Sequence, residues 1–342
     1  MNFQSDNASA VAPQVMEGLL AVNQESAPSY GKDRVTDKAR LAFNQVFDRD
    51  VDVFFMSTGS AANGLSLASI CPPYGAIFAH EEAHIICDEA NAIEAFTGGA
   101  KIVPITGRHG KIDVIELESR IRAWKNSRPH APLPAALSLT QVTEAGTVYK
   151  PAEIKTLAEV AKAHGLAVHM DGARFANAVV ALGESPAAFT WKVGVDVLSF
   201  GGTKNGALAA EAVVFFNRSL AVHTDYLHKR MGQLYSKMRF FSSQFLSLFE
   251  KDLWLHHAQV ANQAATQVAE ILQRCEGVQL LHPVDANEVF VTLPSGLAAD
   301  LRKKGVLFYD WGRPGQNYYR FVTSYNTSSA SIEQLKMACQ LQ

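Results

Sequence analysis

The chain has 342 residues, of which 48% are hydrophobic and 19% are charged, and its formal net charge is −2. This composition is typical of a globular protein with a large core, and the near-neutral charge excludes the basic surface of a nucleic-acid-binding protein. Its four cysteines are widely separated and form no CxxC pair, which argues against a zinc site and a disulfide framework. We find neither a signal peptide nor an apolar run long enough to span a membrane, and therefore expect a cytoplasmic protein without a nucleic-acid or membrane partner.

The first 33 residues are polar and are interrupted by Pro13, Pro28 and Gly31, so we predict an N-terminal arm crossing a surface, with a short helix over 13–22. Beyond it, helical patterns alternate with apolar, strand-like runs. The predicted helices lie at 38–47, 58–70, from 84, 114–124 and 151–164, and the predicted strands at 51–57, 76–79, 101–104, 135–141, 166–170, 196–200 and 212–216. Such alternation predicts an α/β fold with a mostly parallel sheet covered by helices on both faces.

The pattern changes after Asn217, where long helical stretches end in 254–275 and strand-like runs follow at 287–293, 306–309 and 318–323. A helical pattern over 297–304 separates the first two of these runs. We therefore predict three parts: the arm (1–33), a large domain (34–249) and a small C-terminal α+β domain (250–342).

Two chemically demanding residues follow predicted strands of the large domain. Asp171 comes at the end of the run 166–170, and Lys204 comes after the run 195–200, behind Gly201 and Gly202. Parallel sheets bind ligands beyond the carboxyl ends of their strands, where both residues would meet. Such a pair suits pyridoxal phosphate, since the acid keeps the ring nitrogen protonated and the amine condenses with the aldehyde. Taken singly, Asp171 could equally be a helix cap and Lys204 a solvated lysine.

Further candidates lie at the starts of predicted helices. Gly59 and Ser60, in Thr58-Gly59-Ser60-Ala61-Ala62-Asn63, could form a phosphate cup with the helix amides, or Thr58 could simply cap the helix. His84 could stack on a flat cofactor or act as a base, although a histidine there is more often a surface residue. His80 is a weaker competitor, because it lies nearer the strand.

Arginines supply candidate anion ligands. Arg174, three residues after Asp171, could reach the same crevice and bind a carboxylate or the hydroxyl of the cofactor ring. Arg320 lies within an aromatic strand and needs a partner if it faces inward; otherwise it faces solvent. The basic stretch containing Lys229 and Arg239 is either a solvated face or part of a phosphate site across a subunit interface.

These elements in this order resemble the low-specificity threonine aldolase family, which includes phenylserine aldolases and belongs to the fold type I (aspartate-aminotransferase-like) pyridoxal-phosphate enzymes of the beta-eliminating lyase superfamily. The matching motifs are Ser5-Asp6-Asn7, Tyr30-Gly31-Lys32-Asp33, Thr58 to Asn63, Ala83-His84-Ile85, His169 to Arg174 and Ser199 to Lys204. The resemblance extends over essentially the whole chain.

The resemblance implies retro-aldol cleavage of a β-hydroxy-α-amino acid to glycine and an aldehyde, in a homotetramer built from dimers. It implies that Lys204 binds the cofactor covalently, that Asp171 pairs with the ring nitrogen and that His84 stacks on the ring. The other implied roles are phosphate binding by Gly59 and Ser60 and binding of the substrate carboxylate by Ser5, Arg174 and Arg320.

The sequence departs from the family at the expected second histidine, near the substrate hydroxyl. The stretch 139–146 holds none, so Thr143 or Glu144 could approach the hydroxyl instead. The phosphate-binding basic segment is also altered, and only Arg239 carries over. With Tyr30, Phe3 and Phe175 expected near the site, we favour phenylserine slightly over threonine.

Two alternatives remain. One keeps the fold and cofactor but performs β-elimination or transamination on an amino acid. The other is a non-catalytic ligand-binding or scaffolding protein, which the presence of both Asp171 and Lys204 disfavours.

Overall fold

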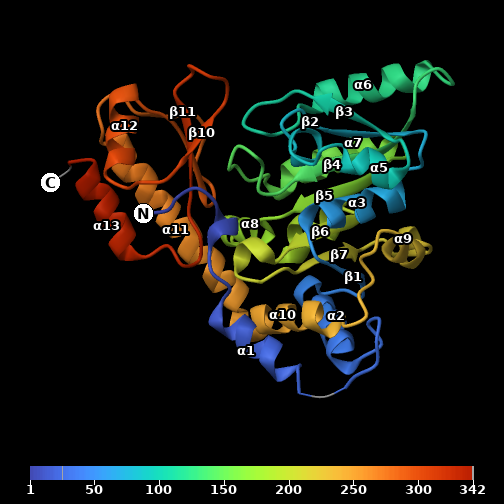
Figure 1. Cartoon of the computed structure of the whole chain (residues 1–342). Helices are drawn as coiled ribbons and strands as arrows, with labels where there is room; N and C mark the ends of the chain where they lie inside the picture. The colour runs from blue at the N-terminus through green and yellow to red at the C-terminus, as the bar shows by residue number, and fades with distance from the viewer. Residues whose placement is uncertain (25, 341–342) are drawn as a thin grey trace.

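The computed structural model describes residues 1–24 and 26–340, which form a large domain around one sheet and a small domain around another (Figure 1). Across the large sheet the strands are β1 (Asp52–Met56), β7 (Glu211–Phe215), β6 (Val197–Gly201), β5 (Ala167–Gly172), β4 (Leu133–Thr140), β2 (Gly75–His80) and β3 (Lys101–Ile105). β7 is antiparallel to both of its neighbours, and the remaining neighbouring pairs are parallel. Every strand except β7 therefore points the same way, which confirms the predicted, mostly parallel α/β sheet.

Helices cover both faces of this sheet. One face carries α3 (Gly59–Ile70), with α5 (Ala92–Thr97) and α9 (Thr224–Arg230) outside it; the other carries α2 (Arg34–Phe47), α6 (Val114–Asn126), α7 (Pro151–Ala163), α8 (Phe175–Leu182) and α10 (Arg239–Phe249). The short α4 (His84–Cys87) follows β2. Most of α3 is small, apolar and buried, as expected for a helix enclosed between a sheet and outer helices.

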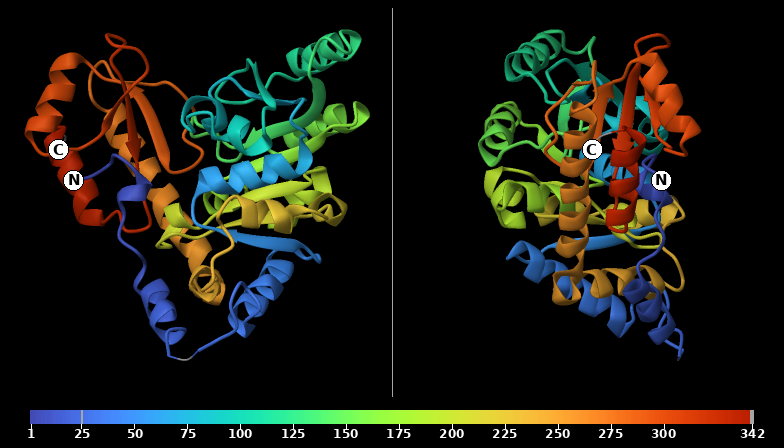
Figure 2. Two further views of the ribbon diagram at one scale, coloured as in Figure 1. Left: turned by 45° about the vertical axis from the view of Figure 1, so that its right-hand side comes forward. Right: turned by 90° about the vertical axis from the view of Figure 1, so that its left-hand side faces the viewer.

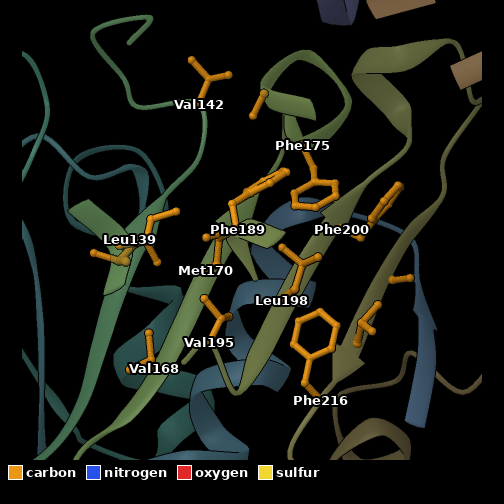
Figure 3. Close-up of a cluster of buried hydrophobic side chains, with 14 of the residues drawn as sticks. Leu139, Val142, Val168, Met170, Phe175, Phe189, Val195, Leu198, Phe200 and Phe216 are labelled. Carbon is orange, nitrogen blue, oxygen red and sulfur yellow. The ribbon is translucent and has the colours of Figure 1, made fainter. Parts of the chain in front are cut away.

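Alternation along β5 and β6 separates a polar face from an aromatic one. Asp171 and Ser199 point toward α3, whereas Met170 and Phe200 point into the core on the opposite face (Figure 3). The ring of Phe200 lies 5.4 Å from the rings of both Phe43 and Phe175, measured between centroids. This packed aromatic layer fixes the strand ends that carry the predicted site residues.

The small domain has an antiparallel sheet in the order β10 (Tyr309–Trp311), β11 (Tyr318–Val322), β9 (Glu288–Thr292) and β8 (Gln279–Leu280), with α11 (Leu253–Gln273), α12 (Ser295–Lys303) and α13 (Ser329–Ala338). α11 links the domains, because Trp254 belongs to the large core and Leu272 to the small one. The predicted strand over 306–309 begins later, at Tyr309, because Leu307 pairs instead with Asn2 of the N-terminal segment.

The N-terminal segment does more than cross a surface. It starts in the small domain and runs to α1 (Pro13–Ala21) beside α10, as the two views of Figure 2 agree. The Phe3 amide donates to the Leu307 carbonyl (2.8 Å), the Val322 amide donates to the Phe3 carbonyl (2.8 Å), and the Phe3 ring is fully buried in the small core. Val15 is likewise buried in the large core, so the arm connects both domains.

Among the described residues, no helix combines the length and apolarity needed to cross a bilayer.

Candidate active site

A cavity of about 280 Å³ opens at the edge where the parallel strands end. β4 ends there with Thr140, β5 ends one residue after Asp171, and β6 ends just before the loop of Lys204. In the sheet, Asp171 is paired with Thr140 on one side and with Ser199 on the other. The cavity is lined by Asn7, Ser57, Thr58, Gly59, Ser60, Asn63, His84, Glu89, Thr140, Val142, Glu144, Asp171, Ala173, Arg174, Thr203, Lys204 and Glu211. Of the predicted site residues, the structure thus brings together Gly59, Ser60, His84, Glu144, Asp171, Arg174 and Lys204.

The Asp171 carboxylate is buried and firmly oriented. Its Oδ2 accepts a hydrogen bond from the Asn63 side-chain amide (2.8 Å), and its Oδ1 accepts one from the Ala173 backbone amide (3.0 Å). Asn63 and Ser66 lie three residues apart on α3 and therefore face the sheet together, where Ser66 pairs with Ser199 (3.1 Å). α3 thus holds the polar ends of β5 and β6 against each other.

Two glycines allow the Lys204 loop to pass through a narrow space. A Cβ atom at Gly201 would lie 2.4 Å from the Ala173 carbonyl oxygen, and one at Gly202 would lie 2.5 Å from the Ala210 carbonyl oxygen. Because no side chain fits at either position, the loop can run directly from β6 into the cavity. Lys204 is the only lysine lining the cavity among the described residues, and none of their ion pairs engages its amine.

His84 stands at the start of α4 with 41% of its side chain exposed. Its Nδ1 donates to Glu89 Oε1 (2.8 Å), and the same oxygen accepts from the Asn63 amide (2.9 Å). The hydrogen bond with Glu89 raises the pKa of His84. An imidazole fixed at one nitrogen, with its ring exposed, is suited to lie against a flat ligand.

The start of α3 forms an open cradle. The Thr58 hydroxyl accepts from the Ala61 amide (3.2 Å), while a Cβ at Gly59 would meet no atom within 4 Å. The first amides of a helix have no partner within it, and the helix dipole favours an anion at this end. This geometry fits the predicted phosphate cup. The first turn of α3 thus contains both the helix cap, Thr58, and the cup at Gly59 and Ser60.

Arg174 joins three parts of the chain. Its Nε and Nη2 donate to the two carboxylate oxygens of Asp6 (2.7 and 3.1 Å), and its Nη1 lies 3.1 Å from Glu288 Oε2 in the small domain. Burial alone would lower the pKa of Arg174, but Asp6 and Glu288 raise it. The guanidinium therefore stays charged beside the cavity.

Two further acids line the cavity in low-dielectric surroundings. Burial raises the pKa of Glu144 to about 7 and that of Glu211 to about 7. Glu211 Oε2 accepts from the Gly202 amide (3.1 Å), and Glu144 Oε1 accepts from the His84 amide (2.7 Å). Both carboxyl groups therefore change charge near neutral pH.

Five predicted site residues lie outside this cavity in the single chain: Ser5, Tyr30, Thr143, Arg239 and Arg320. The Ser5 hydroxyl accepts from the Asn7 amide (3.2 Å), and Asn7 lines the cavity in its place. The Thr143 hydroxyl is buried against Thr147 (2.9 Å). Arg320 reaches the site indirectly, because its Nη1 lies 3.8 Å from Glu288 Oε1 and its guanidinium stacks on Trp311.

The other two lie farther along the surface. Tyr30 lines a separate hollow with Arg40 and His228, and the Arg239 Nε donates to the Val22 carbonyl (3.2 Å). His80 also points away, since its Nδ1 accepts from the Glu82 amide (3.2 Å).

Phe3 and Phe175 are fully buried in the two hydrophobic cores. Neither ring lines the cavity, so the expectation of aromatic side chains around the substrate finds no support from them.

The sequence reasoning missed Asn7, Asn63, Glu89 and Glu211 as residues of the cavity. Asn7 and Asn63 lie inside two of the motifs that carry the family resemblance, but the resemblance predicts roles only for their neighbours. Glu89 follows His84 by five residues, a spacing that carries no marked chemistry. Glu211 opens a strand, and its apolar successors gave no indication of the direction of that strand.

Comparison with known proteins identifies relatives along the whole chain. Residues 2–295 match the family model described as "Beta-eliminating lyase". The chain belongs to the beta-eliminating lyase family. Among curated members, it is 41% identical over 333 residues to a low specificity L-threonine aldolase of Pseudomonas aeruginosa, covering 97% of this chain and 95% of the relative. It is 23% identical to a protein of that name from Saccharomyces cerevisiae, covering 98% of this chain and 85% of the relative. Among solved structures, a Leishmania major threonine aldolase superposes with a TM-score of 0.92 at 26% identity, covering 99% of this chain and 98% of that one.

The cavity of this member of the beta-eliminating lyase family fits pyridoxal phosphate. It presents a buried carboxylate (Asp171), an amine without an ion-pair partner in the described part of the chain (Lys204), an exposed imidazole (His84) and an open helix start (Gly59). Three buried oxygen atoms of lining residues, Asn63 Oδ1, Glu89 Oε2 and Glu144 Oε2, have no hydrogen-bond partner in the described part of the chain. Buried polar atoms are rarely left unpaired, so these atoms indicate a polar ligand.

Proposed function

We propose that this protein uses pyridoxal phosphate to cleave β-hydroxy-α-amino acids of the threonine type to glycine and an aldehyde. The observation that carries the proposal is the meeting of Asp171, Lys204, His84 and Arg174 around one cavity, in a chain that is 41% identical to a low specificity L-threonine aldolase. Bound pyridoxal phosphate supplies an electron sink for the pair released when a bond at Cα breaks.

The residues of the chain fix which bond breaks. Lys204 would hold the cofactor covalently, Asp171 would keep the ring nitrogen protonated, and His84 would pack against the ring. Gly59 and Ser60 would hold the phosphate at the start of α3. Arg174 would bind the substrate carboxylate, with Arg320 acting beside it through the shared Glu288. Clamping the carboxylate orients the Cα substituents, so the Cα–Cβ bond becomes the one aligned for cleavage.

Incubating the purified protein and pyridoxal phosphate with threonine, allo-threonine and β-phenylserine tests this proposal. We expect an aldehyde and glycine in equal amounts, with the threonine isomers cleaved at least as well as phenylserine, because no aromatic side chain lines the cavity within the described residues. The measurement is aldehyde by coupled reduction and glycine by amino-acid analysis. Ammonia together with a keto acid would instead indicate β-elimination, and a keto acid formed without free ammonia would indicate transamination. A protein that never binds the cofactor would contradict catalysis altogether.

We also propose that the protein assembles as a cytoplasmic homotetramer made of dimers. Exposed apolar side chains on the arm and α2 (Met16, Leu20 and Leu41) support burial against another copy. Tyr30 and Arg239, which lie outside the cavity of their own chain, would then be free to serve a neighbouring one. Light scattering should give four times the chain mass, and Leu20→Glu should reduce it; a monomer with full activity would contradict the assembly.

A further inference from the structure

Cleavage of a β-hydroxy amino acid requires a group that removes the hydroxyl proton. The stretch 139–146 lacks the second histidine of the family pattern, so another side chain at the cavity must accept this proton. The candidates are the titratable groups that line it: His84, Glu89, Glu144, Asp171 and Glu211.

Three of these groups are already engaged by strong partners. Both Asp171 oxygens accept hydrogen bonds, from Asn63 and Ala173. Glu211 accepts hydrogen bonds from the Gly202 amide and from both the hydroxyl and the amide of Thr203, so its carboxylate has several donors. His84 donates through Nδ1 to Glu89, and the raised pKa keeps more of this imidazole cationic, which makes it a poorer acceptor at neutral pH.

Glu89 has one unpaired oxygen, Oε2, but its charge is already balanced. Its Oε1 accepts from both Asn63 and His84, and the His84 imidazole forms an ion pair with it when protonated. This carboxylate is therefore committed to orienting Asn63 and the His84 ring.

Within residues 1–24 and 26–340, Glu144 differs from the others in combining an oxygen that accepts no hydrogen bond with the absence of an ion pair. Its Oε1 accepts from the backbone amide of His84 (2.7 Å), which fixes the direction of the carboxyl group. Its Oε2 is buried without a hydrogen-bond partner among the described residues. The group lies at the wall of the cavity, on the loop that follows β4.

From this geometry we infer that Glu144 accepts the β-hydroxyl proton of the substrate through Oε2. The inference rests on the proposed function and supplies its missing base. The O–H bond breaks, its proton moves to Glu144, and the O–H electron pair forms the carbonyl of the aldehyde. The Cα–Cβ pair remains on the glycine side, where Cα gains one proton; one proton leaves the hydroxyl and one is added at Cα, so the products balance.

The surroundings of Glu144 predict the pH dependence. The titratable groups around it are His84, Cys87, Tyr149, Asp171 and Arg174. Because burial raises the pKa of Glu144 to about 7, the carboxylate forms as the pH rises through neutrality. Activity should therefore increase as the pH rises toward about 7 and then level off, since only the ionised form can accept a proton.

The test compares two reactions of the holoenzyme. Glu144→Gln should lower aldehyde release about 10²–10⁴-fold, the usual contribution of a general base. Exchange of the glycine α-hydrogen with deuterated water, followed by NMR, involves no hydroxyl proton and should stay close to wild type. Glu144→Asp should restore part of the cleavage and the acid limb of the pH profile. Thr143→Ser, a matched change outside the cavity on the same loop, should leave both reactions and the profile unchanged.

Two results would overturn the inference. One is a Glu144→Gln variant that releases aldehyde at the wild-type rate and keeps the acid limb of its pH profile. The other is a Glu144→Gln variant that loses aldehyde release and α-hydrogen exchange to the same extent, which would indicate a structural role for Glu144. Failure of the proposed function looks different, because wild-type protein would then release no aldehyde.

Discussion

Replacing Lys204 by alanine is expected to lower kcat/KM for β-hydroxy amino acids by roughly 10⁴-fold, which corresponds to about 5.5 kcal/mol of transition-state stabilisation. The reason is positional. No second lysine lines the cavity among the described residues, so no other amine can take over the covalent bond to the cofactor. The loop that carries Lys204 is also confined by Gly201 and Gly202, which pass close to the Ala173 and Ala210 carbonyls, so no neighbouring residue can shift into its place.

The covalent bond can be measured without turnover. After borohydride reduction, mass spectrometry should find the cofactor attached to wild type at Lys204 and absent from Lys204→Ala. Lys192→Ala is the matched control, because Lys192 is exposed outside the cavity and its amine lies 5.3 Å from the centroid of the Trp191 ring. It should retain the reduced cofactor and full activity. Cofactor that stays attached to Lys204→Ala after reduction, at another lysine, would contradict the assigned anchor.

The sequence was sufficient to place Asp171 and Lys204 together. Both follow continuous apolar runs, and strands of that kind lie side by side in a parallel sheet with their carboxyl ends at one edge. Gly59 and His84 were found in the same way, each just beyond a strand. In all four cases a local pattern and one general rule of sheet topology determine the position.

Other contacts depend on tertiary structure that no local pattern encodes. Glu211 reaches the cavity because β7 runs against its neighbours, which brings its first residue to the edge where the other strands end. Thr143 turns away because its hydroxyl is paired with Thr147, while the next residue, Glu144, lines the cavity. Which of two adjacent polar residues faces a ligand is decided by the hydrogen bonds available on each side.

The role of Asp6 also depends on tertiary structure, because in the sequence this residue is only the middle one of the motif Ser5-Asp6-Asn7. In the structure this side chain is 1% exposed and joins the N-terminal segment to both domains. It accepts two hydrogen bonds from Arg174 and one from the Asn287 side-chain amide (3.0 Å) in the small domain. Burial alone would raise the pKa of Asp6, but Arg174 and Lys204 outweigh this effect and lower it.

Asp6→Ala should therefore destabilise the protein by about 3–5 kcal/mol, the usual cost of removing one partner of a buried ion pair. Arg174 would be left with Glu288 alone, and the buried Asn287 amide would lose one acceptor. Denaturant unfolding of the holoenzyme measures the change. The matched control is Asp52→Ala, which removes the more exposed pair with Arg218 (3.1 Å) and should cost far less stability, because solvent screens such pairs.

Measuring the stability difference between wild type and Asp6→Ala at several pH values distinguishes the contribution of the Asp6 charge from that of its packing. A carboxyl group whose pKa is lowered in the folded state contributes its stability above its unfolded pKa and loses it as the pH falls through the folded value. The gap between wild type and Asp6→Ala should thus be complete at neutral pH and shrink in acid. If the stability difference between wild type and Asp6→Ala stays constant down to strongly acidic pH, Asp6 acts through packing and not through its charge. If Asp6→Ala and Asp52→Ala lose equal free energies of unfolding, the buried ion pair is no stronger than the exposed one. Because Arg174 is the side chain expected to bind the substrate carboxylate, Asp6→Ala should also change KM for the amino acid more than Asp52→Ala does.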